Sequence, residues 1–371
     1  MFSGRVLAPA LAAVMAAFLV WSMVWNYMQS PINTAPEGVE FEVAQGDSLK
    51  TVSASLATAD VLAWPRLFEF WGRLTGRAGS IQAGFYTLKS GMTLAEVLAL
   101  MERGKVNLYP VTILEGWTFA ELQAALAGNP LIKVTLDSVT PDLSGILTDG
   151  LAENNHPEGR FFPDTYMVPR SMSDADLLRQ ANTLLAEKLD TIWSGRDPGL
   201  PLATPYELLI LASIVEREAA LDTERAQIAG VFVRRLQGGM RLQTDPSVIY
   251  GLGTGFDGNL TREHLQSDNP YNTYTRDGLP PTPIGLPGEA SLYAAAHPEP
   301  GETLFFVASG KGDGSHVFSK SLREHNAAVA AYISQQRKLV AAEKAAEAER
   351  ARQQKAEAPA DGGHQGQKES E

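Results

Sequence analysis

The sequence predicts an α+β protein in which an N-terminal apolar helix precedes a small βααβ module and a larger α+β domain. Three observations predict this fold class. An uncharged apolar stretch near the N-terminus is long enough to cross a bilayer. After it, short strand patterns alternate with amphipathic helix patterns that begin after glycine turns. Further along, two apolar helix patterns are followed by a proline-rich loop and a β-hairpin pattern.

The composition narrows the classes of protein to which this chain can belong. It has 371 residues, with 31 Lys and Arg against 43 Asp and Glu, and a net charge of −12. The absence of cysteine excludes a disulfide, a thiol nucleophile and a cysteine zinc site. An acidic chain without a basic cluster is a poor ligand for nucleic acid, so no nucleic-acid partner is expected. The six histidines lack metal-ligand spacing, so we expect no metal and no cofactor.

The apolar stretch at residues 6–28 predicts a transmembrane anchor. It contains no charge and would form a helix of about 35 Å. Trp21, Trp25 and Tyr27 lie at its C-terminal end, where aromatic side chains commonly meet the membrane interface. Arg5 precedes it, which favours a cytoplasmic N-terminus and an exported body. A cleaved signal peptide is the alternative, but the stretch is too long and no small-x-small site follows.

One pattern occurs three times, starting near Phe41, Tyr86 and Val111. Each copy is a short strand, a glycine turn, a Ser or Thr N-cap and an amphipathic helix, in that order. Repetition of one βα element or a turn type that simply recurs would each explain this. The layout of residues 39–108 resembles a LysM-like βααβ module, a fold that in general binds glycans containing N-acetylglucosamine. A polar linker is expected before it, at residues 29–38.

The expected domain organisation follows from these patterns. The last segment is rich in Ala, Glu, Lys and Gln, and should extend a helix and then fray. The predicted parts are a cytoplasmic N-terminus at 1–5, the anchor at 6–28, the linker at 29–38, the module at 39–108, the larger α+β domain at 109–336 and the polar tail at 337–371.

An apolar helix pattern at residues 206–221 carries the clearest chemical signal. It is apolar on nearly every side, as in a buried helix, yet it ends with Glu216 and Glu218. A buried carboxylate must be paired or held neutral, and a desolvated glutamate has the raised pKa of a general acid. Residues two apart on a helix point about 200° apart. One glutamate should therefore face a cleft and the other a cation or solvent, unless both are ordinary helix-end charges.

The segment after this helix adds further candidates. A helix is predicted to start at Asp222 as its N-cap, with Glu224 in the first turn. Asp245 stands before Pro246 and fits the N-cap of the next helix, which gives it a structural explanation. Gln243 has no such explanation.

A polar and aromatic loop follows, with Asn272 and Tyr274. Amide groups beside aromatic faces suit sugar rings, although loop aromatics often only pack. His316 and His325 are either functional or ordinary surface or hydrogen-bonded histidines. The remaining patterns predict a stiff proline-rich loop, a short helix and a β-hairpin, at residues 278–287, 290–296 and 303–319.

The residues at 211–218, Leu-Ala-Ser-Ile-Val-Glu-Arg-Glu, resemble the signature helix of the MltG/YceG-like endolytic murein transglycosylases. Two positions depart from the family pattern: Arg234 stands where Asn is usual, and Thr282 where Gly is usual. The resemblance covers nearly the whole exported part and implies a YceG-like α+β catalytic domain. It continues in order through residues 224–225, 231–232, 240–250, 272–274, 278–281, 294–298, 305–307, 316–318 and 325, and also covers 115–117 and 158–166.

The resemblance implies that Glu218 is catalytic and that the substrate is peptidoglycan. The implied reaction cleaves the β-1,4 bond between N-acetylmuramic acid and N-acetylglucosamine within a strand, leaving a 1,6-anhydro end. It also implies a bacterial inner-membrane location, a role in ending strand elongation and a partnership with peptidoglycan synthases.

The other site residues are hypotheses for substrate binding: Gln243, Asp245, Asn272, Tyr274 and Glu224. Two alternatives remain open. A catalytically silent glycan-binding scaffold would not need a desolvated acid. A hydrolytic muramidase would need a second carboxylate roughly 5–9.5 Å from the catalytic glutamate, for which Glu224 and Asp245 are the nearby candidates.

Overall fold

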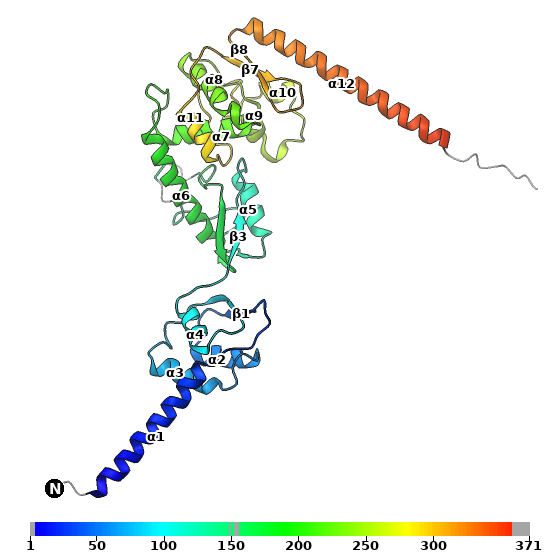
Figure 1. Cartoon of the computed structure of the whole chain (residues 1–371). Helices are drawn as coiled ribbons and strands as arrows, with labels where there is room; N and C mark the ends of the chain where they lie inside the picture. The colour runs from blue at the N-terminus through cyan, green and yellow to red at the C-terminus, as the bar shows by residue number, and fades with distance from the viewer. Residues whose placement is uncertain (1–3, 148–149, 152–155, 358–371) are drawn as a thin grey trace, which may run out of the picture. The chain divides into compact units, whose positions relative to one another are not determined.

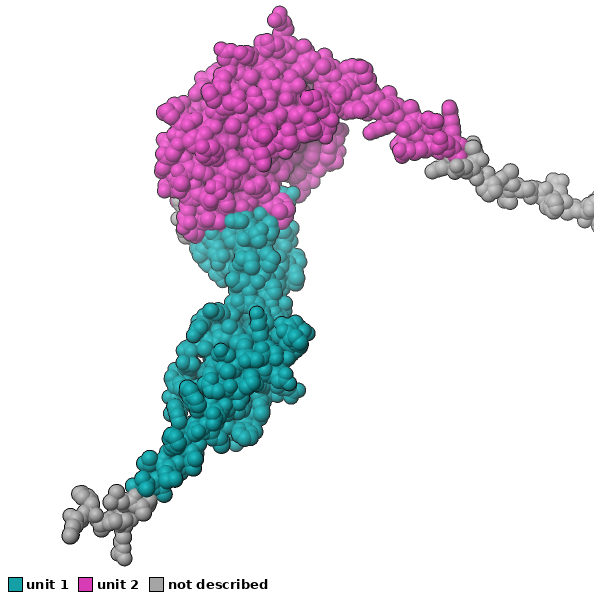
Figure 2. Space-filling view, in the orientation of Figure 1, with its two compact units in different colours: residues 1–113, 121–146, 164–180 teal, residues 114–120, 147–163, 181–371 magenta. Residues whose placement is uncertain are grey.

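The computed structural model describes residues 4–147, 150–151 and 156–357 of the chain (Figure 1). It is a mixed α/β structure that divides into two compact units (Figure 2). Unit 1 comprises residues 1–113, 121–146 and 164–180, and unit 2 comprises residues 114–120, 147–163 and 181–371. Parts of the predicted larger domain, at 109–113, 121–146 and 164–180, therefore group with the N-terminal module.

Unit 1 begins with the predicted apolar helix, α1 (Gly4–Met28). Its segment Ala10–Met28 is long and apolar enough to cross a membrane. The last turns are not wholly free, because Val24 and Met28 are buried against the module that follows.

The predicted βααβ order is confirmed in the module. Strands β1 and β2 pair antiparallel, with Val39 opposite Leu88. The core between sheet and helices contains Phe68, Tyr86 and Leu98, none of them measurably exposed. The elements are β1 (Val39–Val43), α2 (Leu49–Thr58), α3 (Pro65–Leu74), β2 (Gly84–Leu88) and α4 (Leu94–Glu102).

The predicted linker at 29–38 is held against the module by backbone hydrogen bonds. Ile32 donates to Met92 O at 2.7 Å, and Leu94 donates to Ser30 O at 3.2 Å. Pro31 forms a β-bridge with Thr93. The polar sequence of residues 29–38 did not predict this attachment, because hydrogen bonds between main-chain groups do not depend on the type of side chain.

The remaining elements of unit 1 include a second strand pair, in which β3 and β5 run antiparallel, and a short parallel pair of β4 and β6. The three predicted βα repeats are β1–α2, β2–α4 and β3–α5; Ser48 and Thr93 cap the first two helices. The elements are β3 (Leu108–Thr112), α5 (Phe119–Ala127), β4 (Ile132–Lys133), β5 (Thr165–Pro169), β6 (Met172–Ser173) and α6 (Asp174–Ser194), of which α5 and α6 continue across the division between units.

Unit 2 is built around α7, the predicted apolar helix. Every residue from 208 to 215 is buried, and α8 and α11 pack against it. The predicted helix at 290–296 and the β-hairpin are both confirmed. The elements are α7 (Pro205–Glu218), α8 (Arg225–Gln237), α9 (Asp245–Leu252), α10 (Arg262–Gln266), α11 (Glu289–Ala296), β7 (Phe305–Ala308), β8 (His316–Ser319) and α12 (Leu322–Glu357).

Two predicted helix starts were wrong. Asp222 begins a 3₁₀ turn (Asp222–Glu224) that precedes α8, so it does not cap that helix. Asp245 is the first residue of α9 and Thr244 is the N-cap. The predicted tail is helical up to residue 357 as part of α12; the expected fraying falls outside the described residues.

Candidate active site

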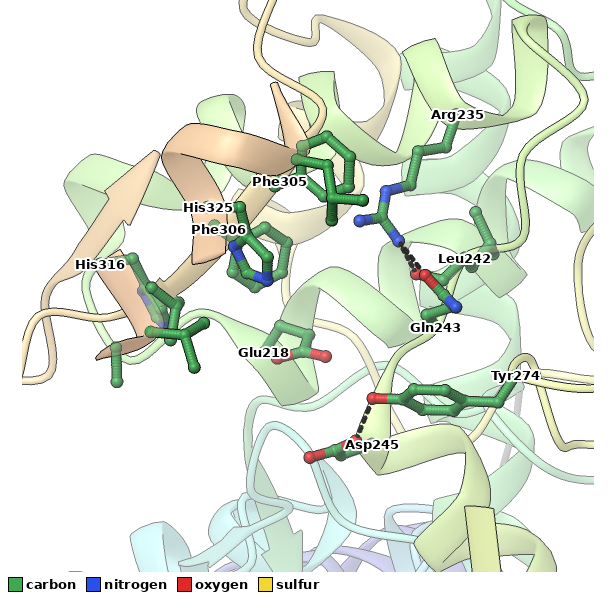
Figure 3. Close-up of a pocket in the computed structure, with 14 residues that line it drawn as sticks. Glu218, Arg235, Leu242, Gln243, Asp245, Tyr274, Phe305, Phe306, His316 and His325 are labelled. Atoms are coloured by element: carbon green, nitrogen blue, oxygen red, sulfur yellow. Dashed lines mark hydrogen bonds between the residues drawn. The ribbon is translucent and has the colours of Figure 1, made fainter. Parts of the chain in front are cut away.

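A cavity of about 400 Å³ lies in unit 2 beside the C-terminal end of α7 (Figure 3). It brings together four of the six predicted site residues, from α7, the segment before α9, the start of α9 and the loop before residue 278. The cavity is lined by Glu218, Arg235, Leu242, Gln243, Asp245, Tyr274, Phe305, Phe306, Val307, Ala308, His316, Leu322, His325 and Val329.

The local sequence places Glu218 at the C-terminal end of a buried helix. The α7 helix begins after Thr204, whose side chain accepts from the Glu207 amide, with Pro205 at its first position. It ends at Ala219, where the backbone becomes extended. Because the buried segment anchors the helix, its last residue is held at a fixed position facing the cavity (Figure 3).

The surroundings of Glu218 favour its protonated form. Burial is the main cause of its raised pKa, and the negative charge of Asp245 adds to it. A hydrogen bond from the Thr244 hydroxyl, at 2.5 Å, and the charges of His316 and Arg235 act in the opposite direction. A carboxyl group held this way can keep a proton at a pH where an exposed glutamate would have lost it.

Glu216 points away from the cavity and forms a buried ion pair, as the helix geometry predicted. Its Oε1 lies 3.3 Å from Arg225 Nη1, and its side chain is only 7% exposed. Its Oε2 accepts from the Gly288 amide at 3.0 Å. The two glutamates therefore have separate roles: one fastens the helix to its surroundings and the other faces the cavity.

Tyr274 and Asp245 form a linked pair on one wall of the cavity. The tyrosine hydroxyl donates to Asp245 Oδ1 at 2.5 Å (Figure 3). Burial and this bond raise the pKa of Tyr274, so the phenol stays protonated. The wall thus presents one anionic acceptor beside an aromatic face.

Gln243 has an unusual backbone conformation, with φ at +50°. The backbone N–H of Gln243 donates to Thr273 O at 3.1 Å, and the side-chain Oε1 lies 3.5 Å from Arg235 Nη1. A left-handed conformation costs about 1 kcal/mol in a residue with a side chain. Glycine would avoid this cost, which makes the Gln243 side chain a candidate for a functional role.

We therefore predict that Gln243→Gly and Gln243→Ala will separate strain from function. Glycine relieves the positive φ and should raise the free energy of unfolding by up to about 1 kcal/mol, whereas alanine should not. Both lose the amide, so both should lose activity on glycan strands if the side chain binds substrate. Urea unfolding and turnover of the two variants check this, and full turnover by Gln243→Ala would remove Gln243 from the site.

The other two predicted residues do not line the cavity. Glu224 accepts from the His316 amide at 3.0 Å, and its Oε2 lies 2.7 Å from His316 Nδ1. Asn272 is fully buried; its Nδ2 donates to three carbonyls, including Ser267 O at 2.7 Å, and its Oδ1 accepts from the Tyr274 amide. Each supports a residue that does line the cavity.

The sequence interpretation missed Arg235, which lines the cavity and is 7% exposed. It donates to Leu304 O at 2.7 Å and to Leu242 O at 2.8 Å. A signal was present: Arg235 lies on the same helix face as Ile228 and Val231, at i+7 and i+4, where a core residue would be expected.

His325 adds an unsatisfied polar group to the cavity. Its ring stacks on Phe305 with centroids 5.2 Å apart, and its Nδ1 is buried without a hydrogen-bond partner. Burial, and next the charge of Arg235, lower its pKa and favour the neutral ring. A buried nitrogen without a partner is suited to a polar group of a bound ligand. Within the described ranges, no three His, Asp or Glu side chains are grouped to hold a metal ion.

The two departures from the family pattern both have partners. Arg234 donates to Thr303 O at 2.7 Å and to Glu299 O at 2.8 Å, which ties α8 to the segment before β7. The hydroxyl of Thr282 lies 2.9 Å from that of Tyr271. Neither residue lines the cavity.

Comparison with known proteins identifies the family to which the chain belongs. A 32% identical protein of Bacillus subtilis, an endolytic murein transglycosylase, aligns over 80% of this chain and 85% of its own length. A streptococcal protein of the same name, from Streptococcus pneumoniae, is 24% identical over 79% of this chain but only 58% of its own length. A crystal structure of a YceG-like protein of Listeria monocytogenes is 27% identical over 78% of this chain and 98% of that one, with a TM-score of 0.49. The model of the YceG-like family matches residues 41–331, and the chain belongs to that family.

Proposed function

We propose that this protein is a peptidoglycan lytic transglycosylase that cleaves glycan strands internally, with Glu218 as its acid and base. Its relatives are named endolytic murein transglycosylases. The observation that carries the assignment of the site is the glutamate at the end of a buried helix, desolvated and facing a cavity of about 400 Å³. A surface that only binds glycans has no need of such a group.

In the first half of the reaction, protonated Glu218 donates its proton to the O4 oxygen that leaves the muramic acid. The bond between C1 and that oxygen breaks as positive charge develops at C1. A raised pKa favours this donation, because it keeps the carboxyl group protonated to a higher pH than an exposed glutamate. Arg235 donates to the carbonyls of Leu304 and Leu242, and Asp245 supplies a negative charge near Glu218.

In the second half, the C6 hydroxyl of the same muramic acid attacks C1. The carboxylate of Glu218 takes the hydroxyl proton, which restores the acid for the next cycle. One bond from C1 to oxygen is lost and one is gained, and no water is consumed. A single carboxylate can therefore complete the reaction.

A hydrolytic enzyme would need a second carboxylate to hold a water molecule. Glu224 is bonded to His316 and does not line the cavity, and Oδ1 of Asp245 accepts from Tyr274. This arrangement favours the transglycosylase over the muramidase.

The other residues receive roles according to their positions. We assign Gln243, Asp245 and Tyr274 to direct contact with the glycan, since they line the cavity. We assign Glu224 and Asn272 to positioning, since they hold His316 and Tyr274. His325 is a further candidate for hydrogen bonding to an acetamido group.

We further propose that α1 anchors the protein in the bacterial inner membrane, with its N-terminus in the cytoplasm and the cavity on the far side. The βααβ module would act as a LysM-like glycan-binding element. A protein in this position could end the elongation of nascent strands beside peptidoglycan synthases.

The chemistry of the new strand ends tests the proposed reaction. A hydrolase leaves a reducing end, which borohydride converts to an alcohol, whereas a 1,6-anhydro end has no free C1 hydroxyl and resists it. We expect the new ends made by the purified protein to resist borohydride. Reducible new ends would establish a hydrolase, and unaltered strands that remain bound would establish a binding scaffold.

The charge of Asp245 should set the pH range of the enzyme. Activity requires protonated Glu218, so kcat/KM should fall as the pH rises through the pKa of Glu218. Asp245→Asn keeps an acceptor for Tyr274 and removes the charge that raises this pKa, so the falling limb should move to lower pH. Tyr274→Phe is the matched control, because it removes the hydrogen bond and leaves the charge. An unmoved limb in Asp245→Asn would contradict the assignment of Glu218 as the acid.

A further inference from the structure

Helix α3 carries an apolar surface that the core does not use. Phe68 and Trp71 are buried, but Phe70 is 47% exposed and Leu74 is 54% exposed. Trp64, the residue before the helix, is 55% exposed. Large apolar side chains gathered on one short helix call for a partner.

The exposed apolar residues form a strip with a defined direction. Phe70 and Leu74 stand at i and i+4, so they share one side of the helix with Leu67, which is half-buried and packs against the core of the module. Trp71 lies beside this strip, at i+4 from Leu67. The charged residues Arg66, Glu69 and Arg73 form the neighbouring row of the helix, since Phe70 follows Arg66 by four residues and precedes Arg73 by three.

The strip lies next to Trp71, the residue through which α3 meets the apolar helix α1. The ring of Trp71 lies 5.4 Å from that of Trp21 and 5.6 Å from that of Trp25, measured between centroids. The two α1 tryptophans are each 46% exposed. The exposed tryptophans of α1 therefore contact α3 through Trp71, beside the exposed strip.

The junction between α1 and the module is fixed, which sets the depth of α3. The Trp64 amide donates to the Tyr27 hydroxyl at 2.9 Å, and their rings stack with centroids 5.8 Å apart. Backbone bonds from the segment at 29–38 to the start of α4 close the same junction. Movement of α1 within a bilayer would carry α3 with it.

The length of α1 places this junction at the membrane boundary. A hydrocarbon core of about 30 Å takes roughly 20 helical residues, and the apolar segment Ala10–Met28 fits this length and ends at Met28. Trp21 and Trp25 lie about 10 and 5 Å before Met28 along the helix. Interfacial helices bury their apolar side to about 5–10 Å, which matches the level at which Trp71 contacts α1.

We propose that α3 is a membrane-interface helix that lies in the outer boundary of the bilayer crossed by α1. Phe70 and Leu74 enter the acyl region, while Arg66 reaches a lipid phosphate beside the ion pair of Arg73 and Glu69. The inference rests on the proposed anchor. If α3 lies in the bilayer boundary, the module rests on the membrane surface, and α3 is not available to bind glycan.

The absence of cysteine from the chain allows a direct test of depth. Single spin labels would be placed on the full-length protein in phosphatidylethanolamine and phosphatidylglycerol bilayers, and their collisions with oxygen and with a water-soluble nickel complex measured. Phe70→Cys and Leu74→Cys probe the strip. Val14→Cys, at a position 66% exposed within the apolar helix, tests the anchor; Glu42→Cys, at an exposed position on β1, is the control for water.

We expect labels at Phe70 and Leu74 to favour oxygen several-fold over the nickel complex, as at Val14, and the label at Glu42 to do the reverse. If Phe70 and Leu74 behave like Glu42 while Val14 stays in lipid, the interface placement is overturned and the anchor stands. A label at Val14 in water overturns both. Labels at Phe70 and Leu74 that respond to purified glycan strands and not to lipid would make α3 a glycan-binding face, which also overturns the proposal.

Discussion

Replacing Glu218 by glutamine is expected to lower kcat for glycan cleavage by about 10²–10⁴-fold, the usual contribution of a general acid or base. Glutamine keeps the shape of the side chain and an acceptor for the Thr244 hydroxyl. It has no proton of suitable acidity to give and cannot take one from the C6 hydroxyl. Single-turnover measurement of strand cleavage checks this, together with a binding assay that should show little change in affinity.

The same variant provides its own control for folding. Because burial raises the pKa of Glu218, the folded protein binds this proton more tightly than the unfolded chain. The carboxyl group therefore costs stability as the pH rises from the unfolded pKa, near 4.5, through the higher folded value. Glu218→Gln should be more stable than the wild type at neutral pH and show no such gain below the unfolded pKa. A variant that loses both activity and stability at neutral pH would contradict this account.

Replacing Glu216 by alanine is expected to have the opposite outcome, a loss of stability of up to about 3 kcal/mol, because Arg225 loses its buried partner and keeps only the exposed Asp222 and the Ser291 hydroxyl. Glu216 and Arg225 are 7% and 12% exposed, so solvent screens them little. The change also leaves the Gly288 amide without its acceptor. Denaturant unfolding, followed by tryptophan fluorescence, measures the effect.

The comparison with Glu218 makes this second result informative. Folded Glu216→Ala protein should retain cleavage at low temperature, since its side chain points away from the cavity. Glu216→Gln is the milder control, because it keeps an acceptor for the Gly288 amide and should lose less stability than alanine. Equal unfolding free energies for wild type and alanine variant would show that the pair does not hold α7 in place.

The different surroundings of Glu216 and Glu218 could be predicted from the sequence, because they depend on local properties of the helix. The helical period sets their directions, and the cost of burying a carboxylate requires that one be paired. The strand–turn–helix repeats were predictable for the same reason. Ser48 and Thr93 cap their helices, and Gly46 and Gly91 take the positive φ that their turns need.

Other parts of the site depend on contacts that no local pattern records. Glu224 meets His316 across 92 residues of sequence, and Arg235 bonds to Leu304 across 69. Asn272 was predicted as a sugar ligand because its loop is polar, and in the structure its side-chain amide bonds the backbone of that loop. Arg235 was the one missed residue with a visible signal, an arginine on the apolar side of a helix.

The central claim is that Glu218 cleaves glycan strands without adding water, and product mass in isotopically labelled water tests it most directly. Purified strands would be treated with wild-type protein and with Glu218→Gln in parallel. The account predicts products one water lighter than hydrolysis gives, without the isotope, and none from the variant. Products that carry labelled oxygen, or equal cleavage by Glu218→Gln, would contradict it.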